Sequence, residues 1–108
     1  MSLLESHVAR FNEGVRSGDW VPMLENFADE AELDFVGIPV GPFRGRAAIA
    51  TAYRAQPPDD ELVVLERRGD GVAVYGWANE PARPAGELHF EERDGRIVRL
   101  RVLYETFT

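Results

Sequence analysis

Few side chains in this sequence could move a proton or hold an oxyanion, and we assign a catalytic role to two of them. Asp34 is the candidate base and Tyr104 the candidate hydrogen-bond donor to a carbonyl or oxyanion. Asp34 alternates with Leu33 and Phe35, so strict alternation makes it an exposed acid on the opposite face. A bulge near Gly37 would exchange the faces, and apolar neighbours would then raise the pKa of Asp34. The alternative for Tyr104 is a half-buried core tyrosine with its hydroxyl at the rim.

The two histidines, His7 and His89, offer a weaker signal. His7 precedes Phe11 by one helical turn, so it could act as an acid or base at the mouth of a pocket. We prefer the alternative that it is a surface residue or has its own hydrogen-bond partner. His89 alternates with Leu88 and Phe90 and is expected to face outward. The two histidines lack metal-ligand spacing, and no His-Glu-x-x-His occurs, so we predict no metal site.

Composition excludes several classes of function. The 108 residues include no cysteine, and all 12 basic residues are arginine, so thiolate chemistry and lysine Schiff bases are ruled out. A net charge of −7 argues against nucleic acid or an anionic membrane as a partner. Gly-x-Ser-x-Gly and Gly-x-Gly-x-x-Gly are both missing, so we expect no serine hydrolase and no cofactor. We expect a single cytoplasmic domain over residues 1–108, without a secretory signal or membrane span.

The pattern of residues predicts an α+β domain. Ser2 and Glu5 have capping-box spacing for a first helix that ends at Gly18, and Asp19 caps a second helix that includes Phe27. Alternation predicts a strand over 31–36, and a helix follows over 46–55. Turn signals then separate four strands, over 61–68, 72–80, 86–92 and 96–106. The mostly antiparallel sheet must curl around three helices to bury its apolar side.

Four short motifs carry a resemblance to a known family and cover nearly the whole chain in the family's order. They are Ser17-Gly18-Asp19-Trp20, Phe27-Ala28-Asp29-Glu30-Ala31, Gly45-Arg46-Ala47-Ala48-Ile49 leading to Tyr53, and Asp94-Gly95-Arg96-Ile97. With them the chain resembles the nuclear transport factor 2-like superfamily, which includes ketosteroid isomerases and SnoaL-like cyclases. The resemblance implies a cone-shaped fold of helices packed on a strongly curved sheet. It implies less about activity, because one fold hosts many functions.

The isomerases of that superfamily use a tyrosine, a carboxylate base and a protonated acid. Those positions fall on Phe11, on Phe35, and on Gly86 or Glu87 of this sequence. Phenylalanine can neither accept a proton nor donate a hydrogen bond to an oxyanion. The chain therefore does not resemble a steroid isomerase in its catalytic residues, and Asp34 lies one residue from the expected base.

The resemblance also implies where a pocket would lie, inside the cone between the first helix and the sheet. We predict that a small hydrophobic ligand binds there, against Phe11, Phe35, Tyr53, Tyr75, Trp77, Leu88, Phe90 and Leu100. The alternative is that these side chains simply fill a core. With a pocket, the chain is a cofactor-independent isomerase, cyclase or hydratase for a hydrophobic carbonyl or polycyclic compound, or a non-catalytic binding module. The third possibility is a structural dimerisation domain, and we expect a homodimer in every case, paired through the outer sheet face that carries Ile97 and Leu103.

Overall fold

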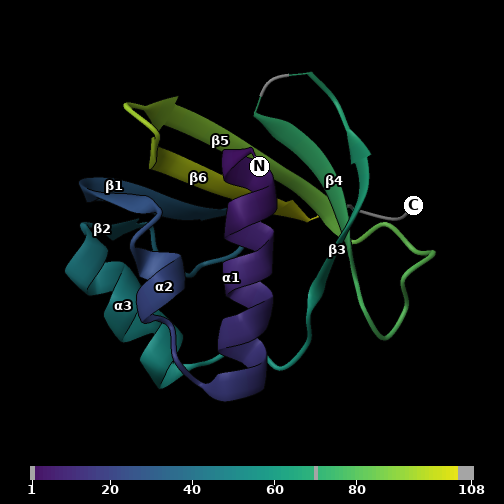
Figure 1. Cartoon of the computed structure of the whole chain (residues 1–108), viewed down its shortest axis with the longest axis horizontal. Helices are drawn as coiled ribbons and strands as arrows, with labels where there is room; N and C mark the ends of the chain where they lie inside the picture. The colour runs from purple at the N-terminus through teal and green to yellow at the C-terminus, as the bar shows by residue number, and fades with distance from the viewer. Residues whose placement is uncertain (1, 70, 105–108) are drawn as a thin grey trace.

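The computed structural model describes residues 2–69 and 71–104, which form three helices and six strands (Figure 1). In chain order these are α1 (Leu3–Ser17), α2 (Val21–Leu24), β1 (Phe27–Val36), β2 (Phe43–Arg44), α3 (Arg46–Ala55), β3 (Leu62–Arg67), β4 (Val72–Trp77), β5 (Gly86–Arg93) and β6 (Arg96–Tyr104). The strands form one sheet in the order β2-β1-β6-β5-β4-β3. Among the described strands, β1 and β6 form the one parallel pair. The predicted α+β class with a mostly antiparallel sheet is confirmed.

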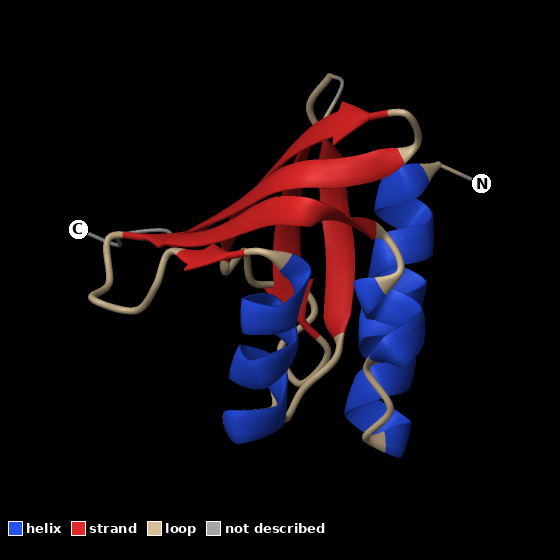
Figure 2. Cartoon of the chain, turned by 90° about the vertical axis from the view of Figure 1, so that its left-hand side faces the viewer, coloured by secondary structure: helices blue, strands red, loops and turns tan. Residues whose placement is uncertain are grey.

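All three helices lie on one side of the sheet, and the sheet curves over them (Figure 2). Helix α1, with α2 beside it, covers one half of this concave face, whereas α3 stands across from them. The core consists of apolar side chains from the helices and from the inner face of the strands. The other face of the sheet is turned away from the helices. No helix among the described residues is long and apolar enough to cross a membrane.

Local sequence fixes α1 at both ends. The Ser2 side chain accepts a hydrogen bond from the Glu5 amide at 3.1 Å, as an N-cap residue does, and its hydroxyl also donates to the Glu5 carboxylate. Gly18 ends the helix in the left-handed conformation, with φ at 79°, where a side chain would be strained. Asn12 ties the helix to the sheet, because its side-chain amide donates to the Leu62 carbonyl and accepts from the Leu62 amide.

The second helix is shorter than the sequence pattern predicts. Asp19 accepts a hydrogen bond from the Val21 amide, but the helix ends at Leu24 after a single turn. Phe27, which we expected on this helix, is the first residue of β1 and is fully buried. The helix ends before the chain reaches Phe27. Phe27 instead pairs with Ile97 of the parallel strand β6.

A β-bulge in β6 changes which residues face the core. Glu91 pairs with Arg99 and Glu92 with Ile97, so Val98 is an extra residue in β6. An extra residue exchanges the two faces of a strand. Ile97 is therefore fully buried in the core, although strict alternation placed it on the outer face with Leu103. Its predicted place in the outer face was wrong.

Candidate active site

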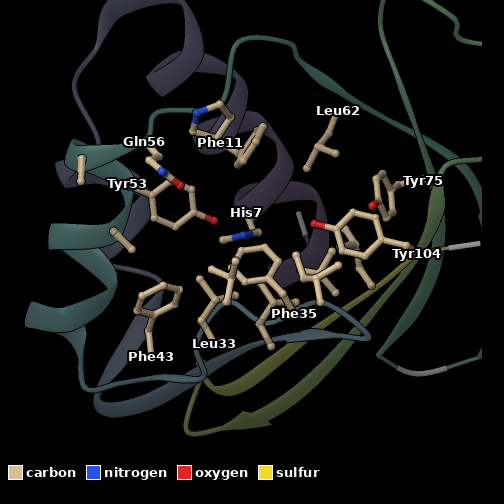
Figure 3. A pocket seen from close by; sticks show the side chains of 18 of the residues that line it. His7, Phe11, Leu33, Phe35, Phe43, Tyr53, Gln56, Leu62, Tyr75 and Tyr104 are labelled. Atoms are coloured by element: carbon tan, nitrogen blue, oxygen red, sulfur yellow. The ribbon is translucent and has the colours of Figure 1, made fainter.

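A cavity of about 750 Å³ opens between α1, α3 and the concave face of the sheet (Figure 3). Most of its wall is apolar, and none of the described residues that line it is an aspartate, glutamate or arginine. The polar side-chain groups in the wall come from His7, Thr51, Gln56, Trp77 and three tyrosines. Burying a charge without a partner is costly, so this environment suits an uncharged ligand.

Most residues that the sequence predicts for ligand binding lie in the cavity wall. These are Phe11, Phe35, Tyr53, Tyr75, Trp77, Leu88 and Leu100, together with the candidate donor Tyr104. They come from α1, α3 and four strands, because alternation in each strand turns every second residue toward the helices. Their contribution to binding or catalysis stays a prediction.

Asp34 and Phe90 are the two predicted residues that do not line the cavity. Asp34 pairs with Arg101 of β6, and its neighbours Leu33 and Phe35 take the positions that face inward. No bulge reverses its direction, so the structure gives no support to Asp34 as a base for a ligand here. Phe90 packs against the ring of His7 in α1, with the ring centroids 5.7 Å apart, and it is not part of the cavity wall.

Two of the tyrosines stand in one row across the sheet. Tyr75 of β4 pairs with Gly86 of β5, which pairs with Tyr104 of β6. A Cβ atom on Gly86 would overlap the backbone carbonyl oxygen of Leu103, so only glycine fits between the two tyrosines. Burial raises the pKa of Tyr75 to about 12 and also raises the pKa of Tyr104. Both hydroxyls therefore stay protonated and able to donate at neutral pH.

The third tyrosine, Tyr53, reaches the cavity from α3 on the opposite side. Its ring packs against Trp20, with centroids 5.1 Å apart, and against Phe11 at 6.3 Å. Trp20 can approach α1 because residue 14 is glycine, where a Cβ would overlap the indole ring. Burial, together with the nearby Tyr104, raises the pKa of Tyr53. In Figure 3 the hydroxyls of Tyr53 and Tyr104 point toward one another from opposite walls, with His7 between them.

His7 lies at the floor of the cavity rather than at its mouth (Figure 3). It is 1% exposed, and its ring makes edge-on contacts with Phe27 and Phe90 at centroid distances of 5.4 and 5.7 Å. Its Nδ1 atom has no hydrogen-bond partner among the described residues. Burial lowers the pKa of His7 to about 4, so the ring is neutral at pH 7. Our preferred expectation of a surface or hydrogen-bonded histidine was wrong.

Comparison with known proteins identifies the fold. No family model and no curated protein matches the sequence, whereas solved structures match over nearly the whole chain. A nuclear transport factor 2-like protein of unknown function from Cytophaga hutchinsonii superposes with a TM-score of 0.68 at 13% identity, covering 95% of this chain and 87% of its own. The chain has the nuclear transport factor 2-like fold.

Two further structures with this fold illustrate its range. A protein from Sphaerobacter thermophilus is 26% identical, with a TM-score of 0.68 and coverage of 97% of this chain and 94% of its own. A Bacillus subtilis protein provisionally named an isomerase is 20% identical, with a TM-score of 0.66 and coverage of 97% and 90%. At these identities the nuclear transport factor 2-like fold is shared, and the reaction is not transferred.

The sequence prediction missed the rim and the helical wall of the cavity. The missed residues include Leu33, Ile38, Val40, Phe43, Thr51, Gln56, Leu62 and Val102. Ile38 and Val40 are each 41% exposed on the loop after β1, an unusual position for aliphatic side chains that could have been a signal. His7 could have been assigned because it lies four residues before Phe11, on the same face of α1. The described residues hold no group of three side chains suited to a metal ion.

Proposed function

We propose that this chain binds a small, apolar, ring-containing molecule in the cavity between α1, α3 and the concave face of the sheet. The observation that carries the proposal is the volume of about 750 Å³ that the core side chains leave open. Ligand pockets commonly enclose about 300 to 1,000 Å³ and combine apolar walls with a few polar groups. Aromatic rings such as those of Phe11, Phe35 and Trp77 offer faces and edges on which a flat ring can pack.

Naphthalene tests this proposal because it has rings and no polar atom. We expect it to raise the melting temperature and to shift the NMR signals of cavity residues such as Trp77. Ala52→Phe should lower its affinity at least about tenfold by filling space in the cavity wall, whereas Ala47→Phe, on an exposed part of the same helix, should leave the affinity unchanged. If naphthalene neither stabilises the protein nor shifts those signals, the proposal is wrong.

A second candidate function is cofactor-independent isomerisation, cyclisation or hydration of a ligand that carries a carbonyl. The observation in its favour is that His7 and three tyrosine hydroxyls line the same apolar cavity. Phenol hydroxyls stabilise an oxyanion as it forms, and a neutral imidazole accepts a proton. The similar structure from Bacillus subtilis bears the name of an isomerase, which adds weight without naming a substrate.

The first step of such a reaction can be followed with 2-tetralone, a bicyclic ketone. The C–H bond beside the carbonyl breaks, the proton passes to His7, and the electron pair moves onto the carbonyl oxygen. In D₂O the imidazole exchanges that proton with solvent, and the reverse step forms a C–D bond, so deuterium replaces the hydrogen beside the carbonyl. We expect exchange at least about tenfold faster with the native protein than with His7→Gln. Equal rates with both proteins would leave binding as the function.

A further inference from the structure

Two buried side chains of the cavity wall have polar atoms that nothing in the described chain satisfies. The Tyr75 hydroxyl and His7 Nδ1 both lack a hydrogen-bond partner, and each residue is 1% exposed. Leaving such a buried polar group without a hydrogen-bond partner destabilises the folded protein. The other unpartnered buried atoms belong to Asn26, Arg46, Arg99 and Arg101, none of which lines the cavity. Among the described residues with such an atom, His7 and Tyr75 are the two that also line the cavity.

Both side chains are uncharged at neutral pH. Burial holds the pKa of His7 near 4 and raises that of Tyr75 to about 12. A carboxylate in the cavity would find no arginine in the described wall, and an amine would find no acidic partner there. A ring hydroxyl suits the pair better than a ketone does. It can accept a hydrogen bond from the Tyr75 hydroxyl and donate one to a neutral imidazole nitrogen, whereas a ketone can only accept.

We propose that Tyr75 and His7 form a polar anchor that selects ligands with an uncharged hydroxyl on a ring, a phenol or an enol, and rejects carboxylates. This inference rests on the proposed binding function and specifies the ligand class. The remaining wall then packs against the apolar part of the ligand. The anchor comes from α1 and β4, two elements that no short sequence motif connects.

Three bicyclic probes that share one ring system test the anchor at pH 7: naphthalene, 2-naphthol and 2-naphthoate. We expect 2-naphthol to bind about tenfold more tightly than naphthalene in a calorimetric titration, the gain expected from about one net hydrogen bond. 2-Naphthoate should bind more weakly than naphthalene because its charge is desolvated without a partner. If all three bind equally, the cavity binds ligands and the anchor is refuted. If none binds, the proposed function fails as well.

Tyr75→Phe removes a single oxygen atom and is the sharpest variant. It should lower the affinity for 2-naphthol to that for naphthalene while leaving the naphthalene affinity unchanged. Because the native hydroxyl has no partner, the free variant should melt at the same temperature as the native protein or above it. Ser17→Ala is the control, since it removes an exposed hydroxyl that does not line the cavity, and it should keep the full preference for 2-naphthol. The reverse result for the two variants would overturn the assignment.

His7→Phe replaces the imidazole with a ring that can still pack between Phe27 and Phe90. We expect the same loss of preference for 2-naphthol as in Tyr75→Phe. If His7→Phe fails to fold, Tyr75→Phe and the control Ser17→Ala still decide the question. A folded His7→Phe that keeps the full tenfold preference would remove His7 from the anchor and contradict the proposal.

Discussion

The two faces of the sheet use the same strands for opposite purposes. On β1, Leu33 and Phe35 turn toward the helices, whereas Glu32 and Asp34 turn away from them. The pattern continues across the sheet. On the inner side Leu33 pairs with Leu100, and Phe35 with Val102. On the outer side charged and polar residues lie opposite one another, as in the rows Glu32–Arg99–Glu91 and Asp34–Arg101–His89.

The difference shows that the side of the sheet, more than the residue type, decides what a titratable group can do. His7 and His89 are the same residue in opposite settings. His7 touches aromatic rings and is almost wholly buried, whereas His89 is 33% exposed and lies 2.8 Å from the Glu87 carboxylate, which also pairs with Arg68. The outer face can hold charged side chains because water and oppositely charged side chains surround them. That this face joins two copies of the chain stays a prediction.

The largest effect expected from this comparison is on stability. Leu33→Ala removes a side chain with no exposed surface and should lower the free energy of unfolding by about 4 kcal/mol. Glu32→Ala, one residue earlier on the outer face, removes a partly exposed carboxylate 3.7 Å from Arg44 and should cost less than about 1 kcal/mol. Urea denaturation of both variants measures the two losses in the free energy of unfolding. Similar losses for the two would mean that the faces are not as different as their burial indicates.

The second effect is the response to acid. The pKa of His7 is about 4 in the folded state and 6.5 when exposed, so the unfolded chain binds a proton more readily. This contribution to stability is complete above pH 6.5 and is lost as the pH falls toward 4. It amounts to about 3 kcal/mol. The free energy of unfolding, measured by chemical denaturation, should fall between pH 7 and pH 4 in both proteins. The fall should be smaller in His7→Gln than in the native protein by about this amount.

His89→Gln is the control for the acid response, because it removes a histidine from the other face. Its loss of stability between pH 7 and pH 4 should stay closer to that of the native protein than to that of His7→Gln. If the two variants respond alike, burial of His7 is not the source of the acid sensitivity.

Much of the fold could be predicted because local sequence specifies it. The N-cap at Ser2, the left-handed Gly18 and the alternation in the strands each act over a few residues. The errors lie where tertiary pairing decides. Phe27 joins β1 because it pairs with Ile97 in a parallel ladder, and Ile97 turns inward because β6 carries an extra residue. Neither the parallel pairing of Phe27 nor the extra residue in β6 can be read from the local sequence.

Part of the candidate site could also be predicted, because the alternation of residues in a strand is a local property of the sequence. Aromatic residues at alternate positions of a strand indicate an inner face, so Phe35, Tyr75 and Trp77 could be placed from sequence. Whether such rings meet or leave a void depends on how far α3 stands from α1, which alternation does not encode. The burial of His7 likewise depends on Phe27 and Phe90, which lie far along the chain.

The smallest effect expected is that of Asp34→Asn, and it bears most directly on the chemistry. Asp34 was the base that sequence suggested, yet it lies beside Arg101 on the outer face and does not line the cavity. We expect the variant to bind 2-naphthol as the native protein does, and to exchange the protons of 2-tetralone at whatever rate the native protein shows. Its stability should change by less than about 1 kcal/mol, because the Asp34 side chain is only partly buried and lies on the outer face of the sheet. A drop of tenfold or more in binding or exchange would mean that the acid reaches the ligand, and the division of roles between the two faces would have to be given up.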